Sequence, residues 1–282
     1  MRSKPLWPVA KKGLLYLLLA VLAIPFLFPF WWMITSAFKP VHEIFAFPPT
    51  LWPSEWRWSN FAQAFTHQPF ALHYLNSIYI AILVTVGTVI ISSLSGYAFA
   101  RIKFRGAPVL FVLLMITLMM PSEVTIIPNF QLMTWLGWHN SHIPLIVVPI
   151  LGAGGVMGTY MMRQFFLGFP REIEEAATVD GLSRPGVFWR IAMPIARPSL
   201  AALSVLAFLG SWNAFLEPLV YLNDLHLFTL PLSLRNFNDG YGLPIWNVQL
   251  AATTMAILPI LIIYVVAQKQ IVQSFTLSGT KG

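Results

Sequence analysis

Long apolar stretches separated by short polar segments run through almost the whole chain. A helix needs about 20 apolar residues to cross the hydrocarbon core of a bilayer, and most of these stretches reach that length. The pattern therefore predicts an all-α integral membrane protein with six transmembrane helices. They are expected at residues 13–38, 75–100, from about 107 to beyond 121, 143–162, 199–222 and 245–267.

The third apolar stretch is the least regular. Its continuous apolar part, residues 109–120, is too short to cross a bilayer as a helix. The helix therefore either begins near Ala107 and continues past Pro121, or is broken at that proline. We expect Pro128 to mark a turn, because proline interrupts helices.

The fourth stretch contains Gly154 and Gly158, four positions apart on one helical face. This spacing allows a second membrane helix to approach closely. The alternative is that the two glycines only reflect how common this residue is in membrane helices.

The composition agrees with a membrane protein and excludes several other classes. Of the 282 residues, 57% are hydrophobic and 10% are charged, and the mean hydropathy is +0.71. A soluble protein of this size could not bury so much apolar side chain. The lack of cysteine excludes disulfides and thiolate chemistry, and no phosphate-binding loop or catalytic or metal-ligand motif is present. We therefore expect no enzyme activity, cofactor or metal.

Lysine and arginine are distributed unevenly between the polar segments. With a cytoplasmic N-terminus and six crossings, inner segments hold 14 of the 17 basic residues, and the outer ones hold only Lys39, Arg57 and Arg235. Because cytoplasmic loops are enriched in these residues, both termini are expected inside the cell. The net charge of +7 thus indicates orientation rather than a nucleic-acid partner. The predicted parts are a cytoplasmic N-terminus 1–12, a first transmembrane helix 13–38, an extracytoplasmic segment 39–73, a transmembrane core 74–268 with a cytoplasmic loop 163–198, and a cytoplasmic tail 269–282.

Two further expectations concern the outer segments. Ser59 or Asn60 is expected to cap a short helix that continues through Phe65. The histidines all fall in or beside outer segments, so we expect them to be solvated surface residues. They are His42, His67, His73, His139, His142 and His226.

The loop 163–198 has the pattern of a short capped helix. Pro170 suits the first helical position, and Glu172, Glu174 and Glu175 lie where the helix dipole favours negative charge. Gly181 lies where a left-handed C-terminal cap is expected. A helix of about three turns is marginal by itself in water, so it needs a partner surface.

Small residues follow the acidic turn of this helix. Ala176, Ala177 and Gly181 carry little side chain, so a groove of another protein could approach the backbone closely. Ser183 is expected to cap a second short helix that ends near Pro194.

The loop also carries a motif that resembles a known family. Glu175-Ala176-Ala177, then Gly181, then Ile191-Ala192-Met193-Pro194 is similar to the "EAA" loop in membrane subunits of bacterial ABC importers. The usual ending is Ile-x-Leu-Pro, and Met193 is a departure of similar volume. Further landmarks resemble the carbohydrate branch of this family, in particular its maltose-system-like second permease. They include Asn60-Phe61, Gly96-Tyr97-Ala98-Phe99-Ala100-Arg101, Met120-Pro121 and Trp212-Asn213.

The resemblance implies a type I ABC importer transmembrane domain in the bacterial inner membrane. It implies a sugar or sugar derivative as substrate, a second permease subunit forming a heterodimer, a cytoplasmic ATPase dimer and an extracytoplasmic solute-binding protein. In this family the loop is a coupling helix that docks on the ATPase. The residues it assigns to coupling here are Glu172, Glu175, Ala176, Ala177, Asp180, Gly181 and Pro194.

Glu217 stands out as a charged residue within a predicted span, where an acid is costly unless it faces water or a partner. In one interpretation Asn213 and Glu217, four apart on one helical face, line a polar passage, and Asn76 and Trp212 join them in the substrate path. In the other, Glu217 is hydrated near the outer end and Asn213 bonds to a neighbouring helix. The family often has an aromatic residue at the position of Glu217.

Two other functions remain as alternatives. An ATP-independent carrier or channel would need ion-coupling acids within the membrane, and only Glu217 is available. A membrane enzyme or scaffold would lay the helix of the polar loop flat on lipid. Its acidic first turns argue against this, because anionic lipid would repel them.

Overall fold

The computed structural model describes residues 7–279, with side chains for residues 11–268. Of the predicted terminal segments, residues 1–6 and 280–282 lie outside the described residues. The chain forms two compact units. Unit 1 comprises Met1–Gln68 with Asn236–Ala256, and unit 2 comprises Pro69–Arg235 with Ile257–Gly282.

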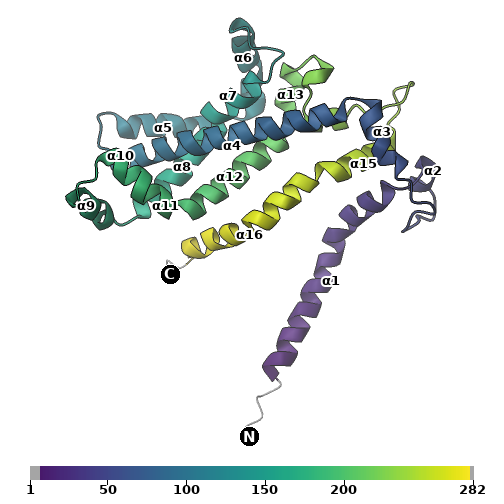
Figure 1. The fold of residues 1–282 in the computed structure, drawn as a ribbon, viewed down its shortest axis with the longest axis horizontal. Helices are drawn as coiled ribbons and strands as arrows, with labels where there is room; N and C mark the ends of the chain where they lie inside the picture. Colours follow the sequence, from purple (N-terminus) through teal and green to yellow (C-terminus); the bar gives the residue numbers. More distant parts are fainter. Residues whose placement is uncertain (1–6, 280–282) are drawn as a thin grey trace. The chain divides into compact units, whose positions relative to one another are not determined.

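Unit 1 is organised around two helices that contact each other, α1 (Trp7–Ser36) and α15 (Trp246–Ala256). The shorter helices α2 (Val41–Ile44) and α3 (Ser59–His67) also pack on α15 (Figure 1). Most apolar side chains of α1 are exposed within this unit. Such a surface is stable only against lipid or another protein.

The expected cap of α3 is wrong. The helix begins at Ser59, and neither Ser59 nor Asn60 caps it. Asn60 is instead buried, where its Nδ2 donates to the carbonyls of Ala37 at 2.8 Å and Lys39 at 3.1 Å. Its Oδ1 accepts from Nδ2 of Asn247 at 2.8 Å. The buried carbonyls after α1 require donors, and this demand decides the role of Asn60.

A buried polar cluster orders the segment after α1. Lys39 donates to the carbonyl of Thr50 at 2.5 Å, and the Glu43 carboxylate accepts from the hydroxyls of Thr50 and Ser54, each at 3.0 Å. Burial acts to raise the pKa of Glu43, but these hydrogen bonds and the charge of Lys39 leave it below its ordinary value. The segment is therefore folded rather than a loose connection.

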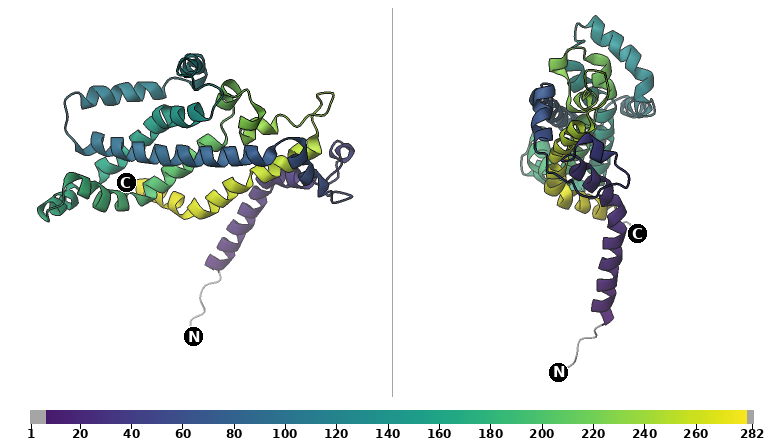
Figure 2. Two further views of the ribbon diagram at one scale, coloured as in Figure 1. Left: turned by 45° about the horizontal axis from the view of Figure 1, so that its top comes forward. Right: turned by 90° about the vertical axis from the view of Figure 1, so that its right-hand side faces the viewer.

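Unit 2 is built on α4 (Phe70–Arg101), which packs against α7 (Ile143–Leu151), α8 (Ala153–Gly168), α12 (Arg197–Trp212) and α14 (Leu230–Leu234). Figure 2 shows α4, in blue, running along this unit. The other elements of unit 2 are α5 (Ala107–Leu118), α6 (Ser122–Trp135), α9 (Arg171–Val179), α10 (Arg184–Val187), a π-helical turn (Phe188–Ala192), α11 (Met193–Ile195), α13 (Leu216–Tyr221), a 3-10 turn (Leu225–Leu227) and α16 (Leu258–Gly279).

The described helices are those of an integral membrane protein. Four are long and apolar enough to cross a membrane: Lys11–Ser36, Phe70–Arg101, Ile143–Gly168 and Trp246–Gln268. Two bent pairs raise the number to six if each pair is one span. They are Ala107–Leu118 with Ser122–Trp135, bent by 104°, and Arg184–Ile195 with Arg197–Trp212, bent by 77°.

The structure decides between the two alternatives for the third stretch at Pro121 and corrects the expectation for Pro128. The third stretch is broken at Pro121, whose backbone is extended with φ −60° and ψ 140°. Pro128 lies inside α6 and marks no turn. A proline in a helix costs one backbone hydrogen bond, which helices of membrane proteins tolerate where the freed carbonyl finds other partners.

Glycines make the contact between α4 and α8 possible. A Cβ on Gly158 would overlap the Ser92 side chain, and a Cβ on Gly96 would lie 2.6 Å from Cβ of Met162. Gly158 thus makes the close approach that its spacing allows. Gly154 does not, because its added Cβ would meet the carbonyl oxygen of Pro149 in the preceding turn.

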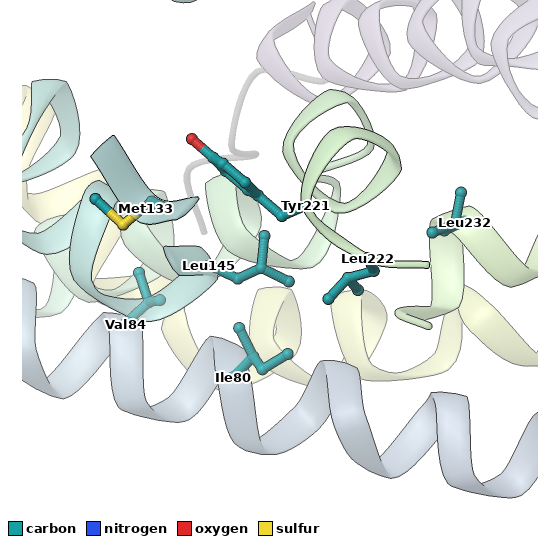
Figure 3. Packing of buried hydrophobic residues seen from close by; sticks show 7 residues of the cluster. All are labelled: Ile80, Val84, Met133, Leu145, Tyr221, Leu222 and Leu232. Atoms are coloured by element: carbon teal, nitrogen blue, oxygen red, sulfur yellow. The ribbon is translucent and has the colours of Figure 1, made fainter. Parts of the chain in front are cut away.

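Buried side chains fill unit 2 at two places along α4. Figure 3 shows the first cluster, in which side chains from α4, α6, α7, α13 and α14 meet. Its members are Ile80, Val84, Met133, Leu145, Tyr221, Leu222 and Leu232. The second lies at the other end of α4 and contains Ala100, Met162, Phe166, Phe188, Ala192, Ala196 and Leu203.

The close contact at Gly96 predicts a clear stability difference between two glycine substitutions. Gly96→Ala should destabilise the protein by about 1–3 kcal/mol, because the new methyl group meets packed side chain and the backbone of Arg163 at 2.8 Å. Gly210→Ala in α12 meets no atom within 4 Å and should be neutral or stabilising by about 0.5–1 kcal/mol. Thermal unfolding in detergent measures both. Equal melting temperatures would contradict this packing.

Candidate functional site

The helix α9 has well-defined ends. Pro170 is the N-cap rather than the predicted first helical residue, because the helix begins one position later, at Arg171. Gly181 has φ +87°, as expected for the left-handed cap. The Gly181 N–H donates to the carbonyl of Thr178 and the Leu182 N–H to that of Ala177, each at 3.0 Å. These two bonds form a Schellman motif, which closes the helix and turns the chain back towards the bundle.

The surface of α9 consists of acidic, small and a few apolar residues. Ile173 is 41% exposed and Val179 is 87% exposed. Of the residues assigned to coupling, Ala177 is buried. The others are exposed, namely Glu172, Glu175, Ala176, Asp180, Gly181 and Pro194. An exposed acidic helix with apolar side chains at its rim is suited to bind another protein.

A buried ion pair holds α9 against the end of α4. Nε of Arg101 lies 3.0 Å from Oε1 of Glu174, and the two side chains are only 7% and 15% exposed. The same guanidinium donates to the carbonyl of Phe169 and lies 5.8 Å from the ring centroid of that residue. Because both charges and the carbonyl are satisfied together, the pair fixes α9 relative to α4.

Sequence reasoning missed this pair. In the sequence, Arg101 is a cytoplasmic charge at the end of a family landmark, and Glu174 is part of an acidic first turn; neither feature predicts that the two residues pair. The available signal was that Arg101 is the charge that ends the longest apolar helix. Its partner lies 73 residues away, so no local pattern could identify it.

The segment after α9 packs against the ends of α4 and α8. Ser183 stands at the N-cap of α10, as expected, although its side chain makes no capping bond. Phe188, Ala192 and Ala196 then bury themselves in the cluster at the end of α4 and α8. A cavity of about 660 Å³ remains between α9 and α4. Its charged lining residues are Arg101, Lys103, Arg171, Glu174, Glu175 and Arg184.

A second cavity, of about 650 Å³, lies inside unit 2. It is bordered by α4, α5, α6, α7, α8, α12 and α13, and most of its wall is apolar. Glu217 is the one charged residue among the described residues that line it. The uncharged polar side chains in the wall are Thr88, Thr117, Ser122, Thr125, Asn129, Ser211, Tyr221 and Thr229.

Of the four candidates for a substrate path, Glu217 alone lines this cavity. The expected shared helical face of Asn213 and Glu217 is wrong, because α12 ends at Trp212 and Glu217 lies in the first turn of α13. Asn213 is the C-cap of α12 and donates from Nδ2 to the carbonyl of Leu209 at 2.9 Å.

Asn76 and Trp212 have packing roles in the described structure. Asn76 is buried and donates to the carbonyls of His226 at 2.9 Å and Phe228 at 3.1 Å. Trp212 is 3% exposed, and its ring centroid lies 5.7 Å from that of Tyr74. Both side chains therefore hold helices together rather than line the cavity.

The expectation of solvated histidines is wrong for His73. It is fully buried, and its Nε2 donates to the carbonyl of Leu225 at 2.7 Å while Nδ1 bonds to Oγ of Ser233 at 2.8 Å. The segment after α13 folds back over α4, and its carbonyls need donors. His142 is half-buried, and the exposed histidines are His42, His67, His139 and His226. No group of potential metal ligands occurs within the described residues.

Comparison with known proteins identifies relatives over nearly the whole chain. Residues 88–276 match the family model of the binding-protein-dependent transport system inner membrane component. The arabinooligosaccharides transport system permease protein AraQ of Halalkalibacterium halodurans is 36% identical, covering 93% of this chain and 94% of the relative. The sn-glycerol-3-phosphate transport system permease protein UgpE of Pectobacterium atrosepticum is 32% identical, covering 91% and 92%.

Solved structures with a similar fold include a bacterial ABC transporter involved in the import of the acidic polysaccharide alginate. The TM-score is 0.80 at 21% identity, and the alignment covers 95% of this chain and 99% of the other. The similarity between this chain and that structure is a similarity of fold.

The buried ion pair predicts that Arg101→Leu loosens α9. Removing one partner of a buried pair costs about 3–5 kcal/mol, because the other charge stays buried alone. Amide hydrogen exchange in residues 171–179 should become at least about tenfold faster. Arg105→Leu, which removes an exposed arginine nearby, should leave exchange unchanged. Unaltered exchange in Arg101→Leu would show that the pair does not hold the helix.

Proposed function

The chain belongs to the family of binding-protein-dependent transport system inner membrane components, and we propose that it imports a sugar or sugar derivative with energy from a separate ATPase. Membership makes it a membrane-spanning permease subunit of an ABC importer in the bacterial inner membrane.

The relatives support a sugar-like substrate. Their names specify arabinooligosaccharides, sulfoquinovosyl glycerol and sn-glycerol-3-phosphate, all of which are rich in hydroxyl groups. The cavity of unit 2 offers hydroxyl and amide side chains set in an apolar wall. Such a wall suits solutes that combine apolar ring faces with hydrogen-bonding groups.

The observation that carries the coupling proposal is α9, exposed on its acidic and small-residue face and tied to α4 by a buried ion pair. We propose that the cytoplasmic ATPase grips this face. Movement of α9 then passes through Arg101 to α4, and through the buried cluster beneath it to α8 and α12. Because these three helices also line the cavity, the movement changes the walls around the substrate.

Several partners follow from this assignment. The chain has no phosphate-binding loop, so ATP hydrolysis takes place in a separate ATPase dimer. A second permease subunit completes a heterodimer, and an extracytoplasmic solute-binding protein delivers the substrate. The bias of basic residues supports the proposal that the termini and loop 163–198 lie in the cytoplasm and segment 39–73 outside.

A bulky residue on α9 should block the ATPase contact. Ala176→Arg keeps a good helix former at an exposed position but prevents close approach to the helix. ATP-dependent sugar uptake by the assembled importer should fall at least about tenfold, a loss of about 1.4 kcal/mol or more in effective coupling. The matched control Ala62→Arg changes an exposed alanine of α3 and should transport normally. Normal uptake by Ala176→Arg, at equal membrane levels, would refute docking at this face.

Charge-reversal variants should distinguish the proposed docking face on α9 from the segment proposed to lie outside. Glu175→Lys is expected to weaken co-purification of the ATPase subunit, because it inverts a charge on the docking face. Glu55→Lys changes another exposed glutamate, in the segment proposed to lie outside, and should retain the ATPase. Quantifying the ATPase bound per permease in detergent compares them. Equal losses would count against a cytoplasmic contact at α9.

A further inference from the structure

Glu217 gives the unit 2 cavity an unbalanced negative charge. It is half-buried in the wall, and no lysine, arginine or histidine among the described residues lines the same space. Low-dielectric walls strengthen the field of a charge and extend its reach compared with water. An anion that enters therefore meets repulsion with no compensating cation.

We propose that this cavity admits uncharged, polyhydroxylated solutes and excludes anionic ones, with Glu217 as the residue that sets the preference. This inference rests on the transport function proposed above and narrows its substrate class. The family alone leaves that class open, because the names of relatives include both arabinooligosaccharides and sn-glycerol-3-phosphate.

Polar side chains in the wall support a hydroxyl-bearing solute. Ser122, Thr125, Asn129 and Ser211 line the cavity, and all four keep exposed surface within the described structure. A carboxylate accepts hydrogen bonds, and hydroxyl and amide side chains can both donate and accept them, which matches the hydroxyl groups of a neutral sugar.

The charge preference can be measured directly, because the chain contains no cysteine. Single thiols are introduced by Ser211→Cys and, separately, Asn129→Cys, both of which line the cavity. The assembled importer in lipid vesicles is treated with a cationic trimethylammonium-ethyl or an anionic sulfonatoethyl thiosulfonate. Labelling of this subunit is followed by mass spectrometry, and each rate is divided by the rate of the same reagent with a free thiol.

The cationic reagent should react about tenfold faster after this correction, because the Glu217 field attracts it and repels the anion. Glu217→Gln should bring the ratio to within about twofold of one, as it removes the charge at nearly constant volume. Glu123→Gln is the matched control, since Glu123 is exposed and does not line the cavity, and it should leave the ratio high.

Protection by sugars tests the solute class. A neutral trisaccharide should slow labelling of the wild-type cavity, whereas a trisaccharide with one uronic acid should slow it only in Glu217→Gln. Equal corrected rates for the two reagents, a ratio unchanged by Glu217→Gln, or equal protection by the two sugars would overturn the proposal. A cavity in which neither thiol reacts is closed to hydrophilic solutes and overturns it as well.

ATP-dependent uptake of the neutral trisaccharide by the same importer distinguishes a failure of the proposed transport function from a failure of the proposed charge preference. Uptake together with equal reagent rates would leave the transport function intact and overturn the charge preference. A high cation ratio without protection or uptake of either sugar would overturn the sugar assignment, both as function and as solute class.

Discussion

The ion pair between Arg101 and Glu174 connects the exposed helix α9 to α4, the helix on which unit 2 is built. Two charges removed from water stabilise a fold only when their remaining hydrogen-bonding groups are satisfied. Here the carbonyl of Phe169 completes the set at the junction between α8 and α9. One guanidinium therefore fixes three segments: the end of α4, the end of α8 and the first turn of α9.

The ion pair connects α9 to the rest of unit 2 only because α4 is itself held by the helices next to it. Between membrane helices the hydrophobic effect supplies little drive, so close packing must hold them together. Gly96 and Gly158 remove the side chains that would keep α4 and α8 apart, and Ser92 adds a bond to the carbonyl of Gly155 at 3.1 Å. The two helices therefore pack together as one element.

The cavity lies where helices of unit 2 are interrupted. The wall includes residues at the break before Pro121, at the boundary of α7 and α8 at Gly152, and after α12 at Ala214. Irregular backbone is tolerated at membrane depth where it borders protein or a water-filled space, because its polar groups can be satisfied there. The same interruptions bring Glu217 to the wall on α13 rather than on a continuous fifth helix.

The sequence by itself determined the apolar membrane-spanning stretches, the family and the C-terminal end of α9, because hydrophobic length and a left-handed glycine after a short helix are local properties. Gly181 is the clearest case, since its position after a short acidic helix already implied its backbone conformation. The sequence did not determine that the predicted fifth helix, residues 199–222, is interrupted between α12 and α13. Only the tertiary structure decided that Arg101 pairs with Glu174, that His73 is buried, and that Asn213 ends a helix instead of sharing a face with Glu217. These outcomes depend on which distant segments meet, and the demand for hydrogen-bond partners at those meetings is invisible in any local pattern.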